Sequence, residues 1–154
     1  MPHKVQIVNN SHHPLPVYAT SGSSGMDLRA FLIAPITLAP MERCLVPTGL
    51  FLAIPENWEA QIRPRSGLAI KQGITCLNTP GTIDADYRGE WMAIFTQIPV
   101  PLGSHNGFTS FPYNVGDRVG QIFFEPVIPI SFEVVPELEN SERGEGGFGS
   151  TGLK

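Results

Sequence analysis

Long hydrophobic runs are missing from this sequence. No purely apolar stretch is longer than LFLAI at residues 50–54, which is far shorter than the roughly 20 residues that a membrane-spanning helix needs. The first residues, MPHKVQIVNNSHHP, contain no apolar segment of the kind that a secretory signal carries. We therefore expect a soluble, cytoplasmic protein without a membrane partner.

Cysteine and positive charge are also scarce. The chain has two cysteines, Cys44 and Cys76, whose wide separation fits no metal site and favours two reduced thiols. Its four histidines show no ligand spacing either. The formal net charge is −4, so no overall charge attracts nucleic acid, and no direct nucleic-acid partner is expected. Any anionic ligand must be held by local charges, backbone N–H groups or a metal ion.

Proline leaves little room for long helices. The 154 residues contain 15 prolines and 16 glycines, and the prolines recur at short intervals along the chain. Alternation of apolar and polar residues, as in WEAQIR (58–63), predicts half-buried strands instead. One short helix is expected over SGLAIKQG (66–73), with Ser66 as its N-cap and Gly73 as its end. Further strands are predicted over residues 5–8, 17–19, 28–31, 44–46, 91–98, 119–125 and 131–135.

These patterns predict an all-β fold, a jelly-roll-like β-sandwich or barrel with one short helix. No internal repeat and no dividing linker is visible, so we expect a single β-domain over residues 1–142. The remaining residues, 143–154, have almost no apolar periodicity and are expected to form a flexible, glycine-rich C-terminal arm.

Two carboxylates follow a predicted turn at TPGT (79–82). Proline and glycine at its central positions favour a type II turn with a positive φ at the glycine, closing a hairpin between residues 74–78 and 83–91. Asp84 and Asp86 are two residues apart and would face the same side of an extended arm. They are either solvated turn acids, or a general base or metal site.

Three further stretches carry polar groups suited to an anionic ligand. In PRSGLA, Arg65 offers a planar fork of donors and Ser66 a hydroxyl, which suits phosphate, although a surface arginine is the plain alternative. In GDRVGQIFFEP, Gln121 either bonds backbone or points at a ligand, because leaving its amide unpaired costs about 1–3 kcal/mol. In SGMDLRA, Asp27 heads a predicted strand.

The glycine-rich tail, RGEGGFGSTG (143–152), has GxxxxG spacing but lacks the Lys-Ser/Thr pair, the strand and the helix of a P-loop, which is therefore excluded. What remains is a segment whose N–H groups can wrap a polyphosphate, with Arg143 at one end and Phe148 placed to stack on a base. Of the ten basic residues seven are arginine, and five of these lie in the glycine-containing stretches. Arginine beside flexible backbone indicates recognition of a phosphorylated small molecule.

Taken together, SGMDLRA, PRSGLA, NTPGTIDADYRGE, GDRVGQ and RGEGGFGST resemble, in order, the five motifs of the homotrimeric deoxyuridine triphosphatases (dUTPases). The motifs run from residue 24 to residue 152 and cover most of the chain. The resemblance implies a jelly-roll homotrimer whose active sites are shared between subunits. It also implies a hydrolase that converts dUTP to dUMP and pyrophosphate with Mg²⁺, which limits uracil incorporation into DNA and supplies dUMP for thymidylate synthesis.

The resemblance also implies roles for individual residues. Asp84 matches the carboxylate that activates the water attacking the α-phosphorus, and Asp27 matches the acid that helps to hold magnesium through water. Tyr87 would pack on the deoxyribose and exclude a 2′-hydroxyl. The other substrate-binding residues implied are Asn78, Thr82, Ile83 and Met92 at the nucleoside, Arg65, Ser66, Gly67 and Gln121 at the phosphates, and Arg143, Phe148, Gly149, Ser150 and Thr151 in the closing arm.

Physical chemistry is consistent with these roles. A triphosphate is strongly anionic and this protein is itself negative, so Mg²⁺ and clustered arginines must offset charge before an oxygen can attack phosphorus. An ionised aspartate can accept a proton from an aligned water. Groups that pair with the edge of uracil would be left unpaired with cytosine, which discriminates between the two bases.

Alternatives to this activity are open at this point. Deoxycytidine triphosphate deaminases share the fold, although the complete arm motif and TIDADYRG argue against deamination. The intact Asp84, Arg65, Gln121 and Arg143 argue against a nucleotide-sensing or partner-binding module without turnover, but a regulatory partner in addition to catalysis is left open. Residues 99–115 form a longer connection than is usual between the third and fourth motifs, and they predict a surface hairpin or a trimer contact.

Overall fold

Short antiparallel strands build the protein, as the many prolines and the alternating residues predict. The computed structural model describes residues 3–99 and 111–147, and every strand ladder within them is antiparallel. The elements are β1 (Gln6–Asn9), β2 (Met26–Arg29), β3 (Ile36–Leu38), β4 (Arg43–Pro47), β5 (Leu50–Ala53), β6 (Trp58–Pro64), α1 (Ser66–Gln72), β7 (Ile74–Cys76), β8 (Gly81–Ile83), β9 (Met92–Gln97), β10 (Phe111–Tyr113) and β11 (Arg118–Pro126).

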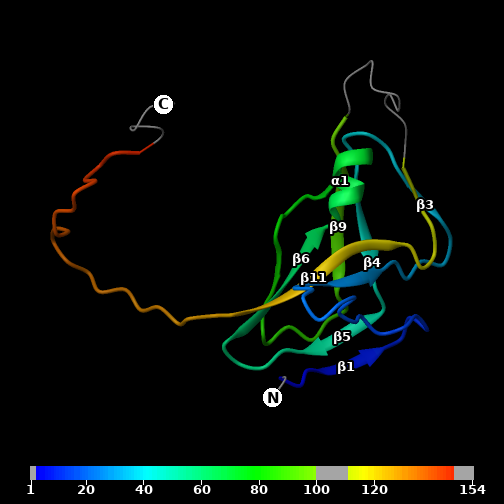
Figure 1. Cartoon of the computed structure of the whole chain (residues 1–154), viewed down its shortest axis with the longest axis horizontal. Helices are drawn as coiled ribbons and strands as arrows, with labels where there is room; N and C mark the ends of the chain where they lie inside the picture. The colour runs from blue at the N-terminus through cyan, green and yellow to red at the C-terminus, as the bar shows by residue number, and fades with distance from the viewer. Residues whose placement is uncertain (1–2, 100–110, 148–154) are drawn as a thin grey trace.

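Two larger sheets and two strand pairs make up the body (Figure 1). Four strands lie in the order β2-β11-β6-β8, three lie in the order β4-β9-β7, β1 pairs with β5, and β3 pairs with β10. Side chains from these layers meet in one apolar core, in which Trp91 and Phe95 are fully buried. The predicted all-β fold with one short helix is therefore confirmed.

Helix α1 is anchored at its end by residues next to β9. Gly73 ends the helix in the left-handed region at φ +67°, as predicted, and a Cβ there would collide with the carbonyl oxygen of Ile98. Buried Gln97 donates its side-chain amide to the carbonyl of Gln72 at 3.0 Å. The predicted N-cap is wrong by one residue, because Arg65 occupies that position and no side chain caps the helix, which begins at Ser66.

The predicted hairpin around TPGT does not form. β7 pairs with β9 and β8 pairs with β6, so the chain crosses from one sheet to the other between them. Gly81 has no positive φ and begins β8, so the predicted type II turn is also wrong. The crossing places Asn78 between the two sheets, and β8 leads directly into Asp84.

Two strand predictions are wrong. Residues 17–19 contribute only an isolated bridge from Tyr18 to Met26, and residues 131–135 form no strand. Beyond Pro126 the chain leaves the body and runs away from it, as the orange and red trace in Figure 1 shows. We call residues 127–147 the extension.

The extension carries apolar side chains that the other described residues leave uncovered. Ile128, Ile130, Phe132 and Val134 alternate along it, and each is at least 79% exposed. This alternation is the reason that the sequence predicts a strand here. A strand needs a hydrogen-bonding neighbour, however, and the rest of the described chain supplies none at these positions.

Other expectations are tested only in part. Cys44 and Cys76 are free thiols, as predicted. No helix in the described ranges is long and apolar enough to cross a membrane. The cytoplasmic location and the division of the chain after residue 142 stay predictions, and residues 100–110 of the predicted surface hairpin lie outside the described residues.

Candidate active site

Six of the predicted nucleoside and catalytic residues gather around one cavity beside β8, which we call the nucleoside cavity. It has a volume of about 270 Å³. β8 and the residues around it supply most of its wall, and β4 and β9 supply the rest. The residues that line it are Leu45, Asn78, Thr82, Ile83, Asp84, Tyr87, Glu90, Trp91, Met92 and Ile94.

The loop after β8 is closed by its own hydrogen bonds. The N–H of Tyr87 donates to the carbonyl of Asp84 at 3.2 Å, and the hydroxyl of Tyr87 donates to the carbonyl of Glu90 at 3.1 Å. The guanidinium of Arg88 donates to the carbonyls of Ala85 at 2.6 Å and Tyr87 at 2.9 Å. These bonds hold the carboxylate of Asp84 and the ring of Tyr87 on one short turn, where both are exposed.

A smaller cavity of about 40 Å³ shares part of this wall. Asn78, Thr82, Ile83 and Met92 line both cavities, and Cys76 lines the smaller one. A polar amide and the backbone of β8 therefore stand next to buried apolar side chains. This combination suits a flat, partly polar ring.

A second set of predicted residues gathers before α1. The guanidinium of Arg65 lies 3.4 Å from one carboxylate oxygen of Asp27 and donates to the carbonyl of Arg118 at 3.1 Å. Arg118 pairs with the other oxygen of Asp27 at 3.0 Å. Gln121 lies opposite Asp27 in the ladder between β11 and β2, so their side chains share a face of the sheet. The helix residues that follow Arg65 are Ser66 and Gly67.

Sequence reasoning missed some residues of both sets. Arg118 was recognisable only as one arginine in GDRVGQ, and no local pattern shows that its side chain meets Asp27 across two strands. Glu90 and Trp91 likewise line the nucleoside cavity without a signal beyond their place next to TIDADYRG.

The groups around Asp27 suit a magnesium ion that is held mainly by water and substrate phosphates and by few protein side chains. The Oδ1 atom of Asp27 is buried and accepts no hydrogen bond from the described residues, while the guanidinium of Arg65 lies 3.4 Å from it. Mg²⁺ usually keeps several waters and binds through one or two carboxylates together with substrate phosphates. The described residues contain no group of three or more His, Cys, Asp or Glu side chains that could hold a metal.

The two sets lie at opposite edges of the four-stranded sheet. Asp27 is on β2 and Asp84 directly follows β8, with β11 and β6 between these strands. Three strand spacings correspond to about 14 Å. Within one chain, the predicted base is thus separated from the predicted phosphate-binding residues.

The described part of the closing arm does not reach either set. Arg143 is exposed on the extension and donates to the carbonyl of Gly146 at 2.6 Å. The other predicted arm residues, Phe148, Gly149, Ser150 and Thr151, lie outside the described residues.

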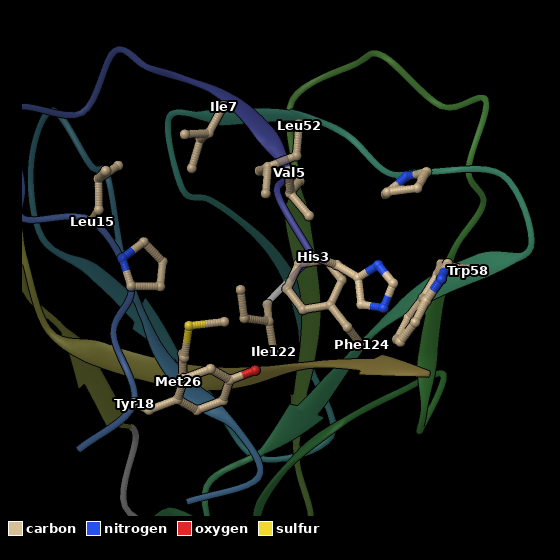
Figure 2. A pocket seen from close by; sticks show the side chains of 12 residues that line it. His3, Val5, Ile7, Leu15, Tyr18, Met26, Leu52, Trp58, Ile122 and Phe124 are labelled. Atoms are coloured by element: carbon tan, nitrogen blue, oxygen red, sulfur yellow. The ribbon is translucent and has the colours of Figure 1, made fainter. Parts of the chain in front are cut away.

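A separate cavity has a different chemistry. Its volume is about 410 Å³, and Figure 2 shows apolar side chains around it, among them Val5, Leu52 and Ile122. The rings of His3 and Trp58 also line it, with 4.8 Å between their centroids. It shares no residue with either predicted set, and no arginine or lysine lines it, so it does not suit a triphosphate.

Comparison with known proteins decides which family this site belongs to. The family model described as dUTPase matches residues 11–152. The chain belongs to the dUTPase family. The deoxyuridine 5′-triphosphate nucleotidohydrolase of Finegoldia magna is 51% identical over 149 residues, which cover 97% of this chain and 99% of the relative. The enzyme of the same name from Fusobacterium nucleatum is 50% identical over 149 residues, which cover 97% of both chains.

Solved dUTPase structures share the fold. The Staphylococcus bacteriophage 80alpha dUTPase with dUPNHPP is 24% identical, with a TM-score of 0.84 over 99% of this chain and 100% of that chain. A mutant dUTPase from phage phi11 of S. aureus, described as showing the coordination of a structural Mg(II) ion, is 20% identical, with a TM-score of 0.76 over 90% and 100%. The likeness confirms the predicted jelly-roll fold.

As a member of the dUTPase family the protein is a hydrolase, and the predicted enzyme class is confirmed. The roles of single residues in this dUTPase-family chain stay predictions, since the comparisons concern whole chains.

Proposed function

We propose that this protein hydrolyses dUTP to dUMP and pyrophosphate, with Asp84 as the base that activates the attacking water. The observation that carries the proposal is the nucleoside cavity, where six residues of one predicted set meet. The family and the names of its relatives support the substrate. The reaction would limit uracil incorporation into DNA and would supply dUMP for thymidylate synthesis.

The nucleoside cavity accounts for recognition of the base and the sugar. The backbone of β8 at Thr82 and Ile83 is fixed in direction by its pairing with β6, so its N–H and C=O groups can read the edge of uracil together with the amide of Asn78. Met92 would contact the base from β9. The ring of Tyr87 would pack against the deoxyribose and leave no room for a 2′-hydroxyl.

Asp84 would carry out the proton transfer. Water would form a bond from its oxygen to the α-phosphorus and pass a proton to the carboxylate of Asp84, while the bond from the α-phosphorus to the bridging oxygen breaks and pyrophosphate leaves. Asp84 is exposed at the end of β8, so a water can reach it. Because Asp84 and Tyr87 share one hydrogen-bonded turn, the carboxylate that takes the proton and the ring that contacts the deoxyribose are positioned together.

The second set would hold the phosphates. Arg65 offers a forked donor group, and Gln121, Ser66 and Gly67 offer further donors beside it. Asp27 would hold Mg²⁺ through water. When bound, the ion supplies positive charge that offsets the charge on the phosphates.

A homotrimer with shared active sites would bring the two sets together. In one chain about 14 Å of sheet separates Asp84 from Asp27. A neighbouring subunit can place its Asp84 beside this chain's phosphate-binding residues without that constraint. Arg143, with the arm from Phe148 to Thr151, would close over a site to which other subunits contribute.

The extension supports this assembly. Its alternating apolar side chains, from Ile128 to Val134, are exposed in the single chain and would be covered by a neighbouring subunit. The apolar cavity of Figure 2 offers a surface of matching chemistry on that neighbour. Burial of these side chains would direct the C-terminal arm away from its own body and toward another subunit's site.

Pyrophosphate release from dUTP, dCTP, dTTP and UTP in the presence of Mg²⁺ tests the proposed function. We expect kcat/KM for dUTP to exceed the values for the other three by roughly 10²-fold or more. Ammonia release from dCTP, or an absence of turnover with all four nucleotides, would overturn the proposal. Equal turnover of UTP and dUTP would reject the role of Tyr87 alone.

A further inference from the structure

The loop that carries Asp84 and Tyr87 is tied to a distant turn of the fold. Glu90, near the end of that loop, accepts a hydrogen bond from the N–H of Gly49 at 2.7 Å. Gly49 lies between β4 and β5 at φ +69°, and a Cβ there would collide with Ser11, which is buried. The turn that presents this N–H is therefore held by its own packing. Glu90 bonds to a donor that has little freedom to move.

Thr48 adds a second tie between the same two segments. Its side chain is buried, and its hydroxyl donates to the carbonyl of Trp91 at 2.6 Å while accepting from the N–H of Leu50 at 3.2 Å. The N–H of Trp91 in turn donates to the carbonyl of Leu50 at 2.8 Å. Both backbone groups of Trp91, directly after Glu90, are thus fixed.

Tyr87 rests on this fixed backbone. Its hydroxyl donates to the carbonyl of Glu90 at 3.1 Å, and its ring occupies the space that a Cβ at Gly89 would need. Tyr87 lines the nucleoside cavity but is 43% exposed, so packing alone leaves its ring room to adopt other rotamers. The position of the Glu90 carbonyl therefore sets where the ring stands.

We infer that Glu90 and Thr48 are positioning residues for Tyr87, and that they set how strongly the enzyme discriminates against a ribonucleotide. The inference rests on the proposed function, in which the ring of Tyr87 packs against the deoxyribose. A ring that shifts away from the sugar leaves room for a 2′-hydroxyl. Removing the hydrogen bond between Glu90 and Gly49, or the one between Thr48 and Trp91, therefore raises the turnover of UTP relative to that of dUTP.

The ratio of kcat/KM for dUTP to kcat/KM for UTP is the quantity that tests this inference. In Glu90→Ala the ratio should fall roughly tenfold to a hundredfold, because small displacements of a positioning group change rates by that order. Glu90→Gln keeps an oxygen that can accept from Gly49, so its ratio should stay within about threefold of the wild-type value. Glu42→Ala is the matched control, since Glu42 also accepts from a backbone N–H, that of Ala39 at 3.1 Å, outside the site. Its ratio should equal that of the wild type.

Two further variants keep the test decisive if Glu90→Ala folds poorly. Thr48→Val keeps the shape of the buried side chain but replaces the hydroxyl with a methyl group, which removes both hydrogen bonds of Thr48, and it should also lower the dUTP-to-UTP ratio. Tyr87→Phe removes the hydroxyl that donates to Glu90. In that background Glu90→Ala should lower the ratio little further, a non-additivity that a general loss of stability would not produce.

The outcomes separate this inference from the proposed function. An unchanged ratio in folded, active Glu90→Ala and Thr48→Val would overturn it, and so would full additivity with Tyr87→Phe. Equal losses on dUTP and UTP together with a lower Tm would mean that the two residues support the fold alone, which would also overturn it. A wild-type protein without turnover of dUTP would instead remove the proposed function.

Discussion

The carboxylate of Asp27 forms an ion pair with the guanidinium of Arg118 across 3.0 Å, between strands β2 and β11. Arg65 approaches the other carboxylate oxygen at 3.4 Å, so one acid faces two arginines. An anionic ligand that binds these arginines competes with Asp27 for their donors. In the proposed function, Asp27 would therefore orient the arginines and, once phosphate has engaged them, offer its oxygens to the water shell of a metal.

Replacing Asp27 should increase the Mg²⁺ concentration that the hydrolysis of dUTP requires. Asp27→Asn removes the charge but keeps the shape, and the Mg²⁺ concentration for half-maximal turnover of dUTP should rise roughly 10- to 100-fold. Titration of pyrophosphate release with Mg²⁺ measures the change. Glu125→Gln is the matched control, because Glu125 pairs with Arg63 at 3.5 Å elsewhere on β11. A wild-type Mg²⁺ response in Asp27→Asn would exclude Asp27 from the metal site.

Replacing Asp84, the predicted general base, should slow the hydrolysis of dUTP without weakening the binding of the nucleotide. Asp84→Asn should lower kcat by roughly 10²- to 10⁴-fold, the usual contribution of a positioned acid or base. Calorimetry with a non-hydrolysable dUTP analogue should give a Kd close to that of the wild type. Asp86→Asn alters another exposed acid of the same loop that does not line the cavity, and its kcat should change little. Similar rates for both variants would contradict the role of Asp84.

Local patterns predicted elements better than the partners of those elements. WEAQIR alternates and forms most of β6, and Gly73 ends α1 in the left-handed conformation that glycine favours. TPGT misleads, because turn chemistry describes only a few residues, whereas the pairing of β7 with β9 depends on the core that both strands share. The alternating residues 131–135 form no strand. Alternation indicates that one face of a segment is apolar, but it does not indicate which chain covers that face.

The sequence predicted the site residues that lie in contiguous motifs, but not the contacts between residues far apart in the chain. Asn78, Asp84 and Tyr87 were expected together from one contiguous stretch, and they line one cavity. The bond between Glu90 and Gly49 joins residues 41 positions apart, so no spacing rule could reveal it. Leu45 also lines the cavity, but in the sequence it is an ordinary strand residue.

The exposed apolar side chains of the extension should be needed for assembly. Phe132 is 95% exposed, and burial of such a ring against a neighbouring subunit would contribute about 1.5–3 kcal/mol for each copy. Phe132→Asp should therefore shift the protein from the proposed trimer toward monomer in sedimentation velocity, with a parallel loss of dUTP turnover. Glu133→Gln changes the adjacent exposed residue outside the alternating apolar set and should leave the trimer intact. A Phe132→Asp protein that stays trimeric would contradict the proposed role of the extension.

Stability should fall in alkali because of a thiol in the core next to the active site. Burial raises the pKa of Cys76 from its ordinary value of 9.0 to about 11. The folded state keeps this proton at a pH where the unfolded state has lost it. The contribution to stability is therefore fully present below pH 9 and is lost as the pH rises from 9 toward 11.

The expected slope is up to about 1.4 kcal/mol of unfolding free energy per pH unit from Cys76. Burial also raises the pKa of Tyr113, but from an ordinary value of 10.0, so the interval between pH 9 and 10 reports mainly the thiols. Urea titrations across that interval measure the slope, and Cys76→Ala serves as the comparison. The variant should be less stable at every pH because it leaves a small cavity, yet its free energy of unfolding should depend less steeply on pH. Because the pKa of half-buried Cys44 is also raised, some slope should persist in Cys76→Ala; a slope equal to that of the wild type would show that Cys76 does not hold its proton in the folded state.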